Sequence, residues 1–105
     1  MIKKKPSEAT IQLAILKHLR VKGIMCWRNQ PMTYNHKLGI NISNPYVMRG
    51  TPDIIAILPK GIFCGIEVKN HKGKQSPDQV LFQKRIEALG GIYILARHVD
   101  DIMHL

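Results

Sequence analysis

Two short apolar runs hold the side chains best suited to chemistry. Residues 50–58 contain Asp53, and residues 62–69 contain Glu67 and Lys69. Both runs are rich in β-branched residues and a Pro-Lys-Gly turn separates them, which predicts two antiparallel strands lying side by side. Side chains alternate between the two faces of a strand. Glu67 and Lys69 should therefore share one face, and the neighbouring strand should bring Asp53 beside them.

Two carboxylates and one ammonium group in this arrangement suit metal-assisted chemistry. Like charges held close together repel, and partial burial adds a desolvation cost; a divalent cation offsets both. Asp53 and Glu67 are hard oxygen ligands of the kind that Mg²⁺ or Mn²⁺ prefers. Lys69 would then act on a phosphate or on an attacking water molecule. The alternative is a surface hairpin with an exposed Glu-Lys ion pair worth less than ~1 kcal/mol.

The segments before these strands predict a helix, a strand and a long loop. Residues 1–6 form a basic arm. After the candidate N-cap Ser7, apolar side chains recur at helical spacing through residues 8–21. Residues 24–28 predict the first strand. Residues 30–49, interrupted by proline and glycine, predict a long loop or loose hairpin leading into the site.

The segments after these strands predict a second helix and a last strand. Residues 70–74 form a basic turn. Ser76 and Gln79 have the spacing of a capping box at the start of a helix, which two consecutive glycines then end. Residues 92–96 are nearly all apolar, which predicts a strand internal to the sheet. Residues 99–105 predict a terminal helical turn.

The order of these motifs resembles that of a known nuclease family. Pro-Asp at 52–53, Glu-Val-Lys at 67–69 and Ser-Pro-Asp-Gln at 76–79 are similar to the PD-(D/E)xK nuclease signature, in the version of its VRR-NUC (virus-type replication-repair nuclease) branch. The resemblance covers about residues 7 to 98. It implies one α/β domain over residues 1–105 with a restriction-endonuclease-like core, a small mixed central sheet flanked by helices in the order α-β-loop-β-β-α-β-α.

The resemblance also implies roles for individual residues. The implied catalytic residues are Glu8, Asp53, Glu67, Lys69 and Gln79. Asp53 and Glu67 would bind the metal together with the backbone carbonyl of Val68, and Glu8 would contribute directly or through a water molecule. Simpler roles stay open for two residues. Glu8 could stabilise the N-terminus of its helix, and Gln79 could serve only as a cap.

The charge balance predicts a polyanionic partner. Lys and Arg total 16 against 7 Asp and Glu, which gives a net charge of +9 and a pI near 9.9. An anionic membrane fits less well, because the chain has no basic amphipathic helix with a bulky aromatic face and no apolar run near the ~20 residues of a membrane span. The candidate nucleic-acid-binding residues are Arg28, Arg49, Lys72 and Lys74, with solvated surface cations as the alternative.

These observations favour a metal-dependent, structure-specific DNA endonuclease that uses Mg²⁺ or Mn²⁺ and no small-molecule cofactor. Small stand-alone members of the resembled family imply a homodimer acting on branched DNA, as a four-way (Holliday) junction resolvase. Cleavage of flaps or other DNA by the same fold is the alternative within the nuclease class, and sequence-specific restriction is another. The rivals outside it are a non-catalytic nucleic-acid-binding module and a small RNA-binding or ribosome-associated protein.

Two cysteines bear on the expected compartment. Cys26 and Cys64 both lie inside apolar runs, so we expect buried thiols and no disulfide or metal pair. The basic start of the chain is not followed by the apolar region of a signal peptide. Both features fit an intracellular, reducing compartment.

Overall fold

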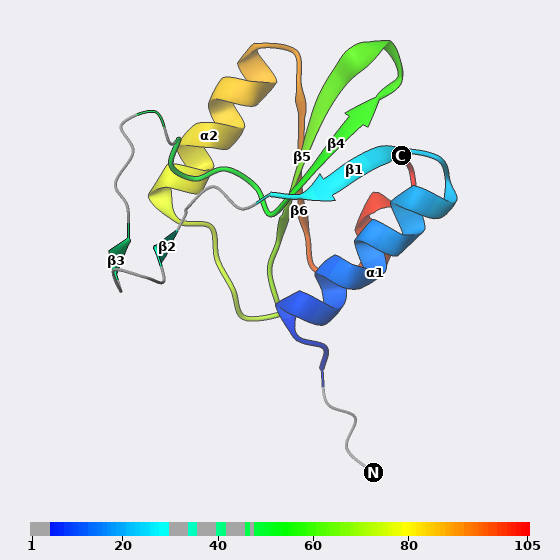
Figure 1. Ribbon diagram of the computed structural model, residues 1–105, viewed down its shortest axis with the longest axis horizontal. Coiled ribbons are helices and arrows are strands. Elements are labelled where there is room, and N and C mark those ends of the chain that lie inside the picture. Colours follow the sequence, from blue (N-terminus) through cyan, green and yellow to red (C-terminus); the bar gives the residue numbers. More distant parts are fainter. Residues whose placement is uncertain (1–4, 30–33, 36–39, 42–45, 47) are drawn as a thin grey trace.

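A computed structural model describes residues 5–29, 34–35, 40–41, 46 and 48–105. The elements are α1 (Glu8–Val21), β1 (Met25–Arg28), β2 (Tyr34–Asn35), β3 (Ile40–Asn41), β4 (Ile54–Leu58), β5 (Ile62–Val68), α2 (Pro77–Ala88) and β6 (Ile92–Ala96), with 3-10 turns η1 (Pro59–Gly61) and η2 (Val99–Ile102). Figure 1 shows α1 and α2 on either side of the central strands. The predicted small mixed sheet flanked by helices is confirmed.

The main sheet has four strands in the order β1-β4-β5-β6. β4 pairs antiparallel with both β1 and β5, while β5 and β6 run parallel. The β4–β5 hairpin turns through η1, where Lys60 has a φ of 68° and Gly61 a φ of 74°. Glycine adopts positive φ without steric cost, so the Pro-Lys-Gly turn predicted from the sequence closes this hairpin.

The two faces of the sheet differ in composition. On one face, apolar side chains of β4, β5 and β6 pack against α1 and η2, and the buried residues of this core include Ile15, Leu19, Ile54, Ile66 and Ile102. The other face carries an aromatic contact to α2, between Phe63 and Phe82, and also the carboxylate of Glu67. Strand alternation separates these two sets of side chains. One face is thus an apolar core and the other combines packing with polar groups.

One expectation for the C-terminal half was wrong. β6 is an edge strand of the sheet, although its apolar sequence predicted an internal one. It is apolar because both of its faces are covered: Tyr93 packs toward α2, while Ala96 joins the core beneath α1.

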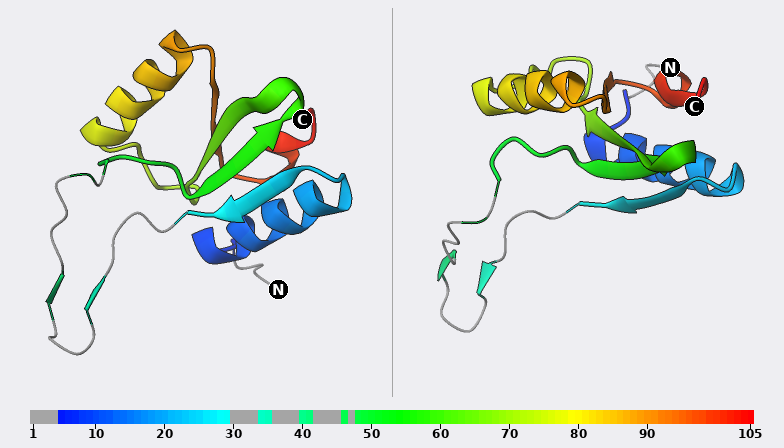
Figure 2. Two further views of the ribbon diagram at one scale, coloured as in Figure 1. Left: turned by 45° about the horizontal axis from the view of Figure 1, so that its top comes forward. Right: turned by 90° about the horizontal axis from the view of Figure 1, so that it is seen from above.

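The segment between β1 and β4 holds the short antiparallel hairpin β2–β3, in which Tyr34 pairs with Asn41 and Asn35 with Ile40 (Figure 2). The expectation of a long loop or loose hairpin covers residues 30–49, of which 30–33, 36–39, 42–45 and 47 lie outside the described residues, as do residues 1–4 of the basic arm. Cys26 and Cys64 are buried free thiols as expected, and burial raises the pKa of Cys64 to about 11.

Candidate active site

Asp53 and Glu67 face each other across the β4–β5 hairpin. Ile54 pairs with Ile66, so the next step of the register places Asp53 opposite Glu67. The backbone N–H of Val68 donates to Oδ2 of Asp53 at 2.8 Å, which ties this carboxylate to the end of β5. The structure therefore brings together the two carboxylates that the strand pattern placed side by side.

The environment of Glu67 opposes its ionisation. Its side chain is only 2% exposed. Burial, followed by a hydrogen bond and charge repulsion from Asp53, raises the pKa of Glu67 to about 9, while the positive charge of Lys69 and the hydroxyl of Tyr93 act in the opposite direction. A carboxyl group that is buried and paired with a second carboxylate is costly to charge without a cation.

Tyr93, on β6, is a site residue that the sequence pattern did not reveal. Its hydroxyl donates to Oε1 of Glu67 at 3.4 Å, and its ring packs 6.2 Å from that of Phe82. Burial raises the pKa of Tyr93 well above its usual range, although a hydrogen bond from Gln75 opposes the shift. Gln75 is also held by Gln83 on α2, to whose Oε1 it donates at 3.0 Å. The parallel pairing of β5 with β6 puts Tyr93 on the face of Glu67, and no short-range pattern predicted that pairing.

Glu8 and Lys69 lie around the turn that follows β5. Oε1 of Glu8 accepts a hydrogen bond of 3.4 Å from the backbone N–H of Asn70. A methyl group added at Gly73 would lie 3.1 Å from Cδ of Lys69 and 3.4 Å from Oε1 of Glu8, so both side chains pack against this glycine. Among the described residues, no three His, Cys, Asp or Glu side chains gather in a way that could hold a metal ion. Glu8 thus lies beside the turn after β5, and it does not form a three-acid cluster with Asp53 and Glu67.

Gln79 serves as a helix cap in this structure. Its Oε1 accepts from the backbone N–H of Ser76 at 2.8 Å, and its own N–H donates to Oγ of Ser76 at 3.2 Å. Gly50, with a φ of 76°, lies against the backbone of Asp78 and Gln79, where a methyl group would come within 2.3 Å of a carbonyl oxygen. The start of α2 is therefore packed against Gly50, which precedes Asp53 by three residues in the chain.

The four candidate nucleic-acid-binding cations are all exposed but do not share one surface. Arg28 lines a shallow depression with Lys17 and Arg20, on the α1 face of β1, opposite the face that carries Glu67. Arg49 precedes Gly50 beside the start of α2, and Lys72 and Lys74 lie on the loop after β5. Of the four, Arg49 and the two lysines lie on segments bordering the acidic pair.

Comparison with known proteins identifies the family and the fold of this chain. The sequence profile of the nuclease-related domain matches residues 8–100. The chain belongs to the nuclease-related domain family. A solved structure described as a VRR_NUC domain is similar at a TM-score of 0.66 and 20% identity, covering 94% of this chain and 97% of that one. A second, a VRR_NUC domain protein, has a TM-score of 0.59 and 16% identity, covering 96% and 85%.

These likenesses identify the fold of this nuclease-related domain as that of VRR_NUC domains. A search of curated proteins returned no significant match. Within the described part of the chain, no helix is long and apolar enough to span a membrane.

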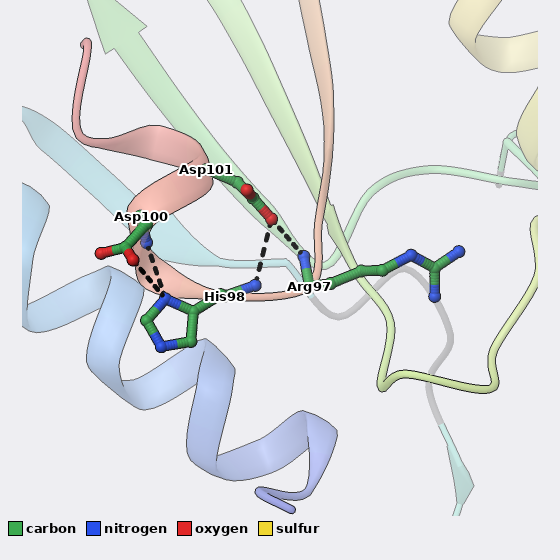
Figure 3. Close-up of polar contacts among 4 residues, drawn as sticks. All are labelled: Arg97, His98, Asp100 and Asp101. Carbon is green, nitrogen blue, oxygen red and sulfur yellow. Dashed lines mark hydrogen bonds and ion pairs between the residues drawn. The ribbon is translucent and has the colours of Figure 1, made fainter.

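Arg97 is a second residue of the nuclease-related domain that sequence reasoning missed. Its Nη1 donates to the carbonyl oxygens of Asn70 at 2.6 Å and Gly73 at 2.8 Å, so it fixes the turn that carries Lys72. Oδ2 of Asp101 accepts from the backbone N–H groups of Arg97 and His98, at 2.8 and 3.2 Å (Figure 3). The cap of η2 thus holds Arg97 in place.

The acidic pair of the nuclease-related domain fits a hard divalent cation. Two carboxylates offer only acceptor oxygens when ionised, and Asp53 lies close enough to disfavour the negative charge of Glu67. A cation bound between them would remove that repulsion, and oxygen ligands of this kind suit Mg²⁺ or Mn²⁺.

Proposed function

We propose that this nuclease-related domain is a Mg²⁺- or Mn²⁺-dependent DNA endonuclease. The observation that carries the proposal is the pairing of Asp53 with the buried Glu67, whose pKa is raised to about 9 by burial and by that neighbour. Both carboxyl groups of such a pair are costly to ionise together unless a cation lies between them, and functional sites are where such costs are retained. The family and the fold support the same reaction class.

In this proposal Asp53, Glu67 and the backbone carbonyl of Val68 hold the cation, and Glu8 adds to the site directly or through water. When bound, the cation polarises the scissile phosphate and lowers the pKa of a water molecule. Lys69 supplies positive charge beside Glu67 and stabilises the charge that develops on the phosphate. Tyr93 orients the Glu67 carboxylate through its 3.4 Å hydrogen bond.

The substrate in this proposal is branched DNA bound by a homodimer. A dimer would present two active sites related by a two-fold axis, which suits paired cuts in a four-way junction, and would carry twice the +9 net charge of one chain. Arg49, Lys72 and Lys74 would contact backbone phosphates next to the acidic pair. Arg28 would contact phosphates only where the DNA reaches around the edge strand β1.

The test is a cleavage assay on labelled four-way junction, splayed flap and plain duplex DNA, each with Mg²⁺, Mn²⁺ or EDTA. We expect metal-dependent cutting, with paired symmetric cuts in the junction. Asp53→Asn should abolish cutting while DNA binding is kept or improves, because negative charge is removed. The matched control is Asp78→Asn, which changes an exposed carboxylate on α2.

Different failures have different meanings. Tight binding without cutting under any metal would overturn the enzymatic assignment and favour a non-catalytic binding module. Cutting of flaps or duplex in preference to the junction would overturn only the resolvase assignment. Equal loss of binding and cutting in Asp53→Asn would contradict the role of Asp53 as a metal ligand.

A further inference from the structure

An open apolar pocket of about 490 Å³ lies beside the acidic pair and takes no part in the proposed metal chemistry. Its lining includes Met48, Pro52, Ile55, Phe63 and Phe82. Ile55 and Phe63 alternate in register with Asp53 and Glu67, so the pocket opens on the same face of the sheet. The α1 core lies on the opposite face.

Pro52 forms the boundary between the pocket and the acidic pair. It precedes Asp53 in the chain, and its ring lies so close to Gly65 that a methyl group there would come within 2.7 Å of Cγ. The side-chain amide of Asn29 donates to Oγ1 of Thr51 and to the carbonyl of Pro52, both at 3.0 Å. These contacts hold Pro52 between Asn29 and Gly65, on the side of the pocket toward the acidic pair. Gly65 is one same-face step, ~7 Å, along β5 from Glu67.

The pocket walls suit a flat aromatic ring. Phe63 and Phe82 both line the pocket, and their rings pack edge to face with centres 6.4 Å apart. Met48 remains 48% exposed on the rim, and a methionine at a binding surface adapts to flat ligands. Trp27, paired with Ile55 on the next strand, adds a further aromatic side chain that is 39% exposed on this face.

The part of the chain that forms one side of the pocket carries no acidic residue, which suits a ligand with a phosphate group. No Asp or Glu occurs between Glu8 and Asp53, a stretch that supplies β1 and the pocket residues up to Pro52. Arg49 follows the rim residue Met48 directly and is exposed. A ligand with an aromatic ring and an attached phosphate group matches the aromatic lining and the exposed arginine. A nucleotide of DNA has both groups.

We propose that this pocket receives the unstacked base of a nucleotide next to the phosphate that is cut. The inference rests on the proposed endonuclease function and deepens it, because it assigns a second contact to the same substrate. A base enters such a pocket most readily where it is mispaired or already single-stranded, since less pairing and stacking is lost. The pocket would thereby favour DNA that is distorted at the cut site, without reading its sequence.

The cut position is first mapped on cleaved DNA. The experiment then measures the binding of three short DNA substrates in EDTA. At the nucleotide flanking the cut, one substrate has a normal base pair, one a mismatch and one an abasic residue. We expect the mismatched DNA to bind about tenfold more tightly than the paired and the abasic DNA, because only it offers a base that is easily unstacked.

Two variants assign that preference to the pocket. Met48→Ala removes a half-exposed rim side chain with little effect on the fold, and Phe63→Leu keeps an apolar side chain while removing the ring. Both should lose most of the preference for the mismatch. Leu89→Ala, a change at an 84% exposed leucine at the end of α2, should keep it.

Three outcomes would overturn the proposal. Equal binding of abasic and mismatched DNA would mean that no base is held. An unchanged preference in both pocket variants would place the recognition elsewhere. A dimer seen by sedimentation that Met48→Ala converts to monomer would assign the pocket to a second copy of the chain. In each case metal-dependent cutting would leave the endonuclease function standing, whereas absence of cutting in any DNA would overturn both.

Discussion

Replacing Glu67 with glutamine should make the metal-free protein insensitive to a pH change that destabilises the native sequence. The Glu67 pKa is raised from 4.5 to about 9 in the folded chain, with burial as the largest cause and Asp53 as the next. Between pH 4.5 and about pH 9, the side chain of Glu67 is protonated in the folded state and ionised in the unfolded state. This contribution to stability is therefore fully present below about pH 4.5 and is lost as the pH rises through about 9.

The magnitude follows from one proton. A difference of one bound proton changes the free energy of unfolding by ~1.4 kcal/mol for each pH unit. Raising the pH from 6 to 8 should thus lower the stability of the metal-free protein by about 2–3 kcal/mol, a large share of the 5–15 kcal/mol typical of a native protein.

The assay is urea unfolding in EDTA at pH 6 and pH 8. The native chain and the control Glu87→Gln, which changes an exposed glutamate on α2, should both lose stability at the higher pH. Glu67→Gln should lose about 2–3 kcal/mol less than either. Addition of Mg²⁺ at pH 8 should restabilise the native chain and the control, because the cation binds the ionised pair, but not Glu67→Gln.

One result would refute this reasoning. If Glu67→Gln and the native chain show the same change between pH 6 and pH 8, then Glu67 ionises without a cost to the fold. The acidic pair would then not be the strained element that calls for a cation.

Three other changes test neighbouring parts of the site. Tyr93→Phe removes the hydroxyl that donates to Glu67, so the Mg²⁺ concentration for half-maximal cleavage should rise about tenfold, measured by titration, while the fold is kept. Lys72→Ala combined with Lys74→Ala should reduce the salt dependence of DNA binding by up to ~2 units of slope in a log-log plot if both lysines contact phosphates. Gly65→Ala should lower the free energy of unfolding by about 1–3 kcal/mol in urea, because its methyl group would lie 2.7 Å from a proline ring.

Features set by neighbouring residues could be predicted from the sequence. The Pro-Lys-Gly turn, the alternation along β5 and the spacing of Asp53 from Glu67 are local, and together they predict a hairpin that brings the two carboxylates together. The cap at Ser76 is local as well, and the structure contains its two hydrogen bonds. In each case the chain has few conformations that satisfy its turn and capping residues.

Features set by distant pairing could not be predicted. The parallel approach of β6 to β5 depends on how α2 crosses the sheet, and it alone brings Tyr93 to Glu67. The same crossing leaves β6 at the edge. Arg97 was missed for a related reason, because its partners Asn70 and Gly73 belong to a turn that only the folded sheet places beside it.

The apolar core and the acidic pair lie on opposite faces of the sheet, which explains why the fold can retain a buried carboxyl group that is costly to ionise. On the α1 face, Ile15, Leu19, Ile54 and Ile66 are fully buried and supply apolar stabilisation that does not depend on the site. Glu67 projects from the opposite face, so the cost of its charge state does not disturb that packing. Removal of the proposed cation should therefore lower the stability of the whole domain and leave its topology unchanged. The face of the sheet toward α2 carries both the acidic pair and the open pocket beside it.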